Sequence, residues 1–230
     1  QLVQLGKIKL DGKITDYLPD YPRKTGDRIS IHHLLTHTSG IPGYTEFTNF
    51  HRDMALNTYT PDVFVKMFAD STLLFEPGTQ WSYSNSGYFL LGAIIEKVTG
   101  KPYEQVLGEN IFKPLGMEST GYDHSQTIIT KRAAGYEKRG RNYLNAGYLD
   151  MSVPYSAGSL YSTVEDLYLW DQALYTDKLI SADNKAKMFT PFLNNYAYGW
   201  GITRAPLGST SENVPTIQHG GGIDGFNTLI

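Results

Sequence analysis

The segment from about Ser86 to Val98 constrains the fold most strongly. Its apolar side chains recur at helical spacing, at Leu90, Leu91, Ile94, Ile95 and Val98. A Pro-Gly turn at 77–78 precedes it and Gly100 follows it, which are typical boundary signals of a helix. A helix with an apolar stripe this complete has to bury that stripe, so the sequence predicts a core helix near the middle of the chain.

Further helix starts are marked by capping residues on both sides of this core helix. We expect helices to begin after Ser30, Thr60-Pro61, Pro102, Ser162 and Ser181. Ser162 with Glu165 three positions later has the pattern of a capping box, and this helix should run to about Leu174.

Strand-like composition is concentrated near the end of the chain, at 196–203, 215–219 and 225–230. Residues 120–160 show turn signals and no helical period, which predicts loops and short strands. Helices in the middle and strands at the end indicate an α/β fold of the α+β type, with a helical lobe inserted into, or packed against, an antiparallel sheet.

Composition excludes several classes of partner. The net charge is -3, and no basic block is long enough to follow a run of phosphates, so nucleic acid is a poor fit. The longest apolar run, 88–95, is far shorter than the roughly 20 residues of a membrane-spanning helix. The chain has no cysteine, which rules out disulfides, thiol nucleophiles and zinc-thiolate sites.

Two short segments carry the most chemistry: Tyr83-Ser84-Asn85, just before the core helix, and His219-Gly220-Gly221-Gly222, at the end of a strand. The sequence also contains four longer stretches of interest: "HHLLTHTSGIPGY", "FEPGTQWSYSNSGYFLLGAIIEKVTG", "IFKPLGM" and "SAGSLYSTVEDL". In order and spacing these stretches resemble the family of class C β-lactamases, D,D-peptidases and related esterases, over essentially the whole chain.

This resemblance implies a β-lactamase/transpeptidase-like fold, with an antiparallel sheet flanked by helices plus a helical lobe. Residues 1–230 would be one incomplete domain, with the helical lobe at about 30–160 and the sheet lobe at 1–29 and 161–230. The first residues resemble the middle of a helix and the last a strand cut in mid-run, so we expect truncation at both ends.

The family combines a Ser-x-x-Lys, a Tyr-x-Asn and a Lys- or His-x-Gly. Tyr83 and Asn85 match the second element, and His219 and Gly221 match the third. No Ser or Thr in the sequence is followed three positions later by Lys. We therefore expect the nucleophilic serine upstream of Gln1, and we expect the 230 residues alone to be inactive.

The resemblance also implies a role for each matching residue. Tyr83 would be the base that activates the serine, provided that nearby cations lower its pKa. Asn85 would hold a substrate amide, and His219 would donate a hydrogen bond to a substrate carboxylate or to Tyr83. Gly221 would leave room for substrate along the strand, and the N–H of Gly222 would be an oxyanion donor.

Two other motifs match known binding-site patterns only in part. Gly220 to Gly225 matches G-x-G-x-x-G, but a strand-like segment follows where a dinucleotide site requires a helix. His33 and His37 stand four apart, but Leu34 occupies the position where the zincin pattern requires Glu. We interpret both histidines as local hydrogen-bonding residues of the turn to Gly40, and we predict neither metal nor cofactor.

The sequence thus predicts a serine hydrolase that forms an acyl-serine intermediate with an amide, a β-lactam or an ester. Its partners would be small molecules or peptides that carry D-amino acids, and family resemblance places it in the periplasm, in the cell envelope or outside the cell. The alternative is a non-catalytic relative that has lost the nucleophile and binds peptidoglycan or a protein.

Overall fold

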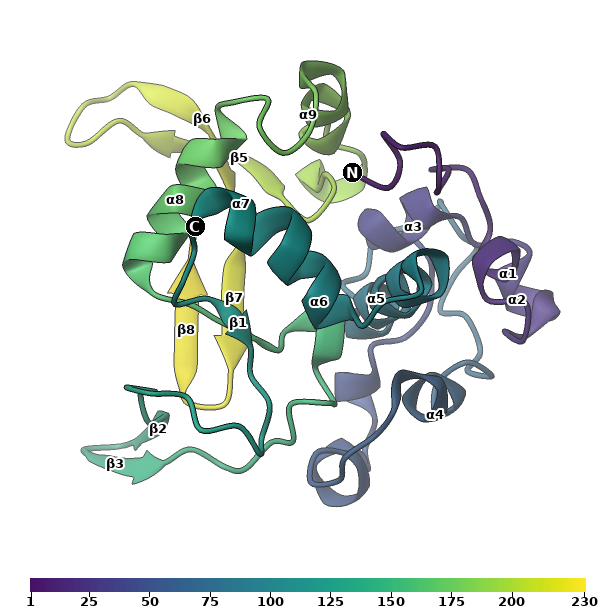
Figure 1. Cartoon of the computed structure of the whole chain (residues 1–230), viewed down its shortest axis with the longest axis horizontal. Helices are drawn as coiled ribbons and strands as arrows, with labels where there is room; N and C mark the ends of the chain where they lie inside the picture. Colours follow the sequence, from purple (N-terminus) through teal and green to yellow (C-terminus); the bar gives the residue numbers. More distant parts are fainter.

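The computed structural model describes all residues from 1 to 230. Its α-helices are α1 (Ile14–Tyr17), α2 (Arg23–Gly26), α3 (Ile31–Leu35), α4 (Pro61–Lys66), α5 (Asn85–Thr99), α6 (Tyr103–Leu107), α7 (Lys113–Leu115), α8 (Val164–Leu174) and α9 (Ala182–Met188). Short 3-10 or π turns are η1 (Tyr44–Glu46), η2 (Phe50–Met54), η3 (Gly108–Phe112), η4 (Tyr155–Ala157) and η5 (Leu193–Asn195). Figure 1 shows α1 to α6 gathered on one side of the molecule.

The strands form four antiparallel pairs on the other side (Figure 1). These pairs are β1 (Gly121–Tyr122) with β4 (Leu160–Tyr161), β2 (Tyr136–Arg139) with β3 (Asn142–Asn145), β5 (Gly201–Pro206) with β6 (Asn213–Gln218), and β7 (Gly220–Ile223) with β8 (Phe226–Leu229). His219 is the single residue between β6 and β7, and it exchanges both backbone hydrogen bonds with Ile230. It therefore lies where one hairpin passes into the next.

Helix α5 is the centre of the core, as its apolar stripe predicts. Phe89, Leu90 and Ile94 are at most 1% exposed and belong to one buried cluster of 20 residues. Leu91, Ile95 and Val98 are partly buried and pack against that cluster. Burying side chains of this size stabilises the fold by about 1.5 to 3 kcal/mol each. Helix α5 is therefore held firmly, and so are the chain segments directly before and after it.

The turn η4 packs against α5 where the helix has no side chain. A Cβ at Gly92 would come within 2.1 Å of the Ser156 hydroxyl oxygen. That hydroxyl donates a hydrogen bond to the carbonyl of Tyr88 at 2.8 Å. Glycine at this position lets the two segments touch.

Most of the predicted helix starts are confirmed, and one is wrong. The Ser30 and Ser181 side chains each accept an N–H from the first turn of the helix that follows. At α8 the N-cap is Thr163 and not Ser162, because the Thr163 hydroxyl accepts the N–H of Asp166. The Ser162 hydroxyl bonds Thr120 instead. Both residues are good caps, and only the path of the chain decides between them.

Two further differences concern the strands and the N-terminal part. Gly220–Ile223 lies between two predicted strands and is not itself among them, but it forms β7 because its backbone pairs with β8. Residues 1–29, assigned to the sheet lobe, contain short helices and no strand. Ile8 and Ile14 share a buried cluster with Phe64 and Phe89 of the helical side. The outer bounds of the two lobes remain a prediction.

None of the helices combines the length and the apolar character needed to cross a membrane.

Candidate active site

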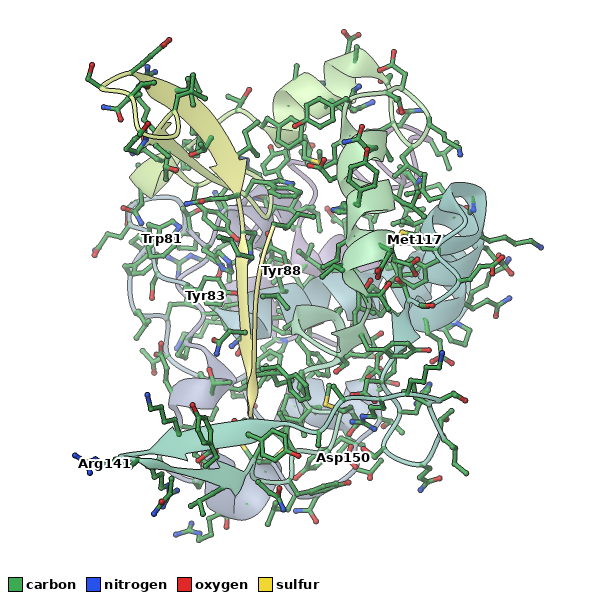
Figure 2. All side chains as sticks on the ribbon, turned by 90° about the vertical axis from the view of Figure 1, so that its left-hand side faces the viewer. Trp81, Tyr83, Tyr88, Met117, Arg141 and Asp150 are labelled. Carbon is green, nitrogen blue, oxygen red and sulfur yellow. The ribbon has the colours of Figure 1, made fainter.

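Tyr83 lies in an extended segment that leads directly into α5. The next residue, Ser84, is the N-cap, and its hydroxyl accepts the N–H of Gly87 at 3.2 Å. Tyr83 is 41% exposed, so another molecule can reach it. Figure 2 shows Trp81, Tyr83 and Tyr88 gathered beside the β-strands of the C-terminal hairpins.

Burial of the phenol raises the pKa of Tyr83 above its ordinary value. Burial is the sole cause, and no Lys or Arg among these residues acts in the opposite direction. To act as a base, Tyr83 needs a nearby cation that lowers its pKa. Residues 1–230 do not supply that cation.

The fold brings His219 toward Tyr83 from the sheet side. The two ring centroids are 6.4 Å apart, although the residues are far apart in the sequence. The expected hydrogen bond from His219 to Tyr83 is not formed. Nε2 of His219 shares a hydrogen bond of 2.9 Å with the Tyr196 hydroxyl. Sequence reasoning missed Tyr196, one of 17 tyrosines, because no motif distinguishes it.

Asn85 is the first residue of α5 and lies one position beyond the N-cap. Its side-chain amide donates a hydrogen bond to the Thr45 hydroxyl at 3.2 Å, which links α5 to η1. The neighbouring Ser86 hydroxyl donates to the Pro42 carbonyl and accepts the N–H of Tyr44. These bonds tie the loop before η1 to the start of α5. The role of Asn85 in holding a substrate amide remains a prediction.

Gly221 and Gly222 lie in β7, opposite Thr228 and Asn227 of β8. A Cβ at Gly221 would lie 2.4 Å from the Thr228 hydroxyl oxygen, so packing against β8 is itself a reason for glycine there. His219 and Ile230 form a hydrogen-bonded pair, and such pairs alternate along an antiparallel ladder. The N–H of Gly222 therefore points away from β8, which leaves it available as a donor.

The two histidines that stand four residues apart, His33 and His37, have separate structural roles. Nδ1 of His33 accepts the N–H of Ser30, and burial is the largest cause that lowers the pKa of His33, to about 4. His37 lies beyond the end of α3, and its Nδ1 accepts the N–H of Ser84. The prediction that His37 is a local hydrogen-bonding residue is wrong, because its Nδ1 bonds Ser84 of the segment that carries Tyr83.

A cavity with several polar side chains lies away from the predicted site residues. This cavity, of about 500 Å³, is bordered by Tyr59, Glu96, Tyr122 and Asp150, among others, and by none of Tyr83, Asn85 and His219. Glu96 is near the C-terminal end of α5, whereas Asn85 opens its N-terminal end. The candidate active site is therefore an exposed wall built from the start of α5 and the junction of β6 and β7.

The fold around this wall is of the β-lactamase and transpeptidase-like class. The chain belongs to the β-lactamase family, a family of serine hydrolases, because the family model described as "Beta-lactamase" matches residues 1–230. The fold that the sequence predicted is thereby confirmed.

Curated relatives support the same assignment. The chain is 36% identical over 229 residues to the protein PbpX of Bacillus subtilis strain 168, named as a penicillin-binding protein, and covers 54% of it. It is 33% identical to penicillin-binding protein 4* of the same strain and covers 53% of it. Both alignments include 100% of this chain. The chain thus spans about half the length of the curated relatives it matches.

Solved structures with the same fold include a D-stereospecific amidohydrolase and a D-amino acid amidase. A D-stereospecific amidohydrolase from a Streptomyces species has a TM-score of 0.82 at 29% identity, covering 98% of this chain and 71% of that one. A D-amino acid amidase from Ochrobactrum anthropi SV3 has a TM-score of 0.78 at 28% identity, covering 97% and 65%.

Proposed function

We propose that this protein catalyses acyl transfer to water through an acyl-serine intermediate, with Tyr83, Asn85, His219 and Gly222 as its contribution from residues 1–230. The observation that carries the proposal is the convergence of Tyr83 and His219, whose ring centroids lie 6.4 Å apart on one exposed wall. A partner Ser-x-x-Lys, which these residues do not contain, would come from a longer form of the protein.

Each step of the proposed reaction uses a group on this wall. The serine Oγ attacks the carbonyl carbon of the substrate and gives its proton to the Tyr83 phenolate. The N–H of Gly222 donates to the oxyanion, a contact that is typically worth about 2.7 to 4 kcal/mol in the transition state. The scissile C–N or C–O bond then breaks, and the leaving group takes the proton from Tyr83. Water next attacks the acyl carbon, the C–Oγ bond breaks, and the serine oxygen regains a proton from the water.

The Lys of the Ser-x-x-Lys motif has a specific role in this proposal. Burial raises the pKa of Tyr83, so a phenolate at neutral pH requires a cation within a few ångströms. Tyr83 as a residue is 41% exposed, which leaves room for such a cation to approach it.

Peptides and amides of D-amino acids are the substrates we propose first, with β-lactams and esters as further acyl donors. Two lines of support favour this order. The solved structures of similar fold include a D-stereospecific amidohydrolase and a D-amino acid amidase. At the end of β6 the chain has His219, which resembles the D,D-peptidase and esterase branches more than the β-lactamases with Lys there.

The test is covalent labelling of the full natural length of the protein and, in parallel, of residues 1–230. Intact mass would be measured before and after exposure to a fluorophosphonate, with penicillin as a second reagent. We expect one adduct per full-length molecule, on a serine of a Ser-x-x-Lys, and none on residues 1–230. The variant Tyr83→Phe should be labelled about 10² to 10⁴ times more slowly, the usual contribution of a general base.

Two outcomes would overturn the proposal. Labelling of folded residues 1–230 would show that the nucleophile lies among them. A folded full-length protein that takes up no adduct from either reagent would instead favour the non-catalytic peptidoglycan- or protein-binding alternative.

A further inference from the structure

His37 makes two hydrogen bonds that flank Tyr83 on either side. The N–H of Ser82 donates to the His37 carbonyl at 2.9 Å, and the N–H of Ser84 donates to Nδ1 of His37 at 3.0 Å. Between these two bonds the rings of His37 and Tyr83 lie against each other, with centroids 4.1 Å apart and planes inclined by 34°. One residue thus holds the backbone before Tyr83, the backbone after it, and the ring itself.

The backbone of His37 is held in an uncommon conformation to make these contacts. Its φ is +55°, in the left-handed region that side chains with a Cβ rarely adopt. Such a conformation persists where the surroundings fix it, and it is often found at functional sites. The side chain is 1% exposed and lies against Trp81, Tyr88 and Tyr196 in addition to Tyr83. Its position is therefore fixed by packing on several sides.

The hydrogen bond from Ser84 also fixes the protonation of the ring. Because Nδ1 accepts a hydrogen bond, it carries no proton, so the neutral ring has its proton on Nε2. Nε2 is buried and has no hydrogen-bond partner. Burial, with a smaller effect of His219, lowers the pKa of His37 to about 3. The titratable groups around the ring are Tyr83, Tyr88, Tyr196 and His219. The acceptor at Nδ1 is therefore retained at neutral and mildly acidic pH.

We propose that His37 is a positioning residue for Tyr83: its carbonyl and Nδ1 clamp the two flanking peptide N–H groups, and its ring sets the angle of the phenol. This inference rests on the proposed function, in which Tyr83 is the base. A displacement of about 1 Å at a reacting group costs about 10²-fold in rate, so a clamp on both sides of Tyr83 affects the reaction directly.

Two substitutions separate the parts of the clamp. Asn places an acceptor oxygen at the position of Nδ1 and tolerates the left-handed backbone, so His37→Asn keeps the hydrogen bond to Ser84 and loses the ring. His37→Phe keeps a ring against Tyr83 and loses the acceptor. Both variants would be made in the full natural length of the protein, together with the wild type.

The first readout is the acylation rate by penicillin, separated into binding and chemical steps. We expect His37→Phe to slow the chemical step by about 10²-fold with little change in the apparent dissociation constant, and His37→Asn to recover at least tenfold of that loss. Equal rates in the wild type and His37→Phe would overturn the proposal. A loss confined to the dissociation constant would also contradict it, because that result indicates a general role in binding.

The second readout does not need enzymatic activity. In the wild type, ¹⁵N NMR of His37 should show a proton on Nε2 and none on Nδ1 from pH 7.5 to pH 5, and a proton on Nδ1 would refute the clamp even if no variant folds. The ¹³Cζ resonance of Tyr83, assigned with Tyr83→Phe, should shift in His37→Phe. If none of the proteins is acylated while these resonances behave as expected, the proposed function fails and the clamp stands.

Discussion

The hydroxyl of Tyr196 and Nε2 of His219 lie 2.9 Å apart and share a hydrogen bond at the junction of β6 and β7. A second pair of the same chemistry occurs away from the candidate active site, where the Tyr198 hydroxyl and Nδ1 of His32 are also 2.9 Å apart. The two pairs allow the effect of a Tyr–His bond on stability to be separated from its effect on the site.

Replacing Tyr196 by Phe removes the hydroxyl that orients His219. We expect Tyr196→Phe to lower the free energy of unfolding by about 0.5 to 1.5 kcal/mol, the usual net value of a hydrogen bond. We also expect it to slow acylation of the full-length protein by about tenfold. Tyr198→Phe is the matched control, with a similar loss in urea denaturation and an unchanged acylation rate. If both variants acylate at the wild-type rate, Tyr196 has no part in the site.

Replacing Ser84 by Ala removes the N-cap of α5. The hydroxyl accepts the N–H of Gly87, and both residues are buried, so the freed donor finds no water. We expect Ser84→Ala to cost about 1 to 2 kcal/mol, in the upper part of the range for caps. Ser181→Ala removes the more exposed cap of α9 and should cost less. Urea denaturation of both variants measures the difference, and an equal cost would show that burial of the cap is unimportant.

Replacing Gly225 by Ala should separate two hairpins that touch. Gly225 has a φ of +82°, and a Cβ there would lie 2.6 Å from backbone atoms of Gly135 and Tyr136, just before and in β2. The left-handed backbone costs about 1 to 2 kcal/mol and the overlap about 1 to 3 more. Gly208→Ala is the control, because its φ is +58° and its Cβ would meet nothing within 4 Å. Thermal denaturation should show a clearly larger loss for Gly225→Ala than for Gly208→Ala.

Stability should fall as the pH drops below 6.5, and His37 should account for part of that loss. Its pKa is about 3 in the folded protein, against the ordinary histidine value of 6.5 in the unfolded chain. Protons therefore bind the unfolded chain first, and the contribution of the neutral ring, present in full above pH 6.5, is lost as the pH falls toward 3. From pH 7 to pH 5 this contribution decreases by about 2 kcal/mol.

The measurement is the free energy of unfolding of the wild type and His37→Asn at pH 7 and pH 5. Asn does not titrate, so the destabilisation caused by the substitution should be smaller at pH 5 than at pH 7. A destabilisation that is the same at both pH values would mean that the ring is protonated in the folded protein.

Local features were predicted well wherever neighbouring residues determine them. The stripe at Leu90 and Ile94 is buried, and Ser30 and Ser181 cap the helices expected of them. Helix periodicity and capping involve residues within one or two turns, so the sequence carries them directly. The resemblance to the family rests on motifs in the same way, and it led to the correct family and fold.

The contacts within the candidate active site depended on the tertiary structure. Nothing near His37 in the sequence indicates that its ring meets Tyr83, and nothing near Tyr196 indicates a bond to His219. The choice of Thr163 over Ser162 as a cap is of the same kind. Each contact joins groups whose partners are decided by how whole elements pack together. The sequence by itself therefore determined which residues can do chemistry, and the tertiary structure decided which of them meet, because distances between residues far apart in the chain follow from packing.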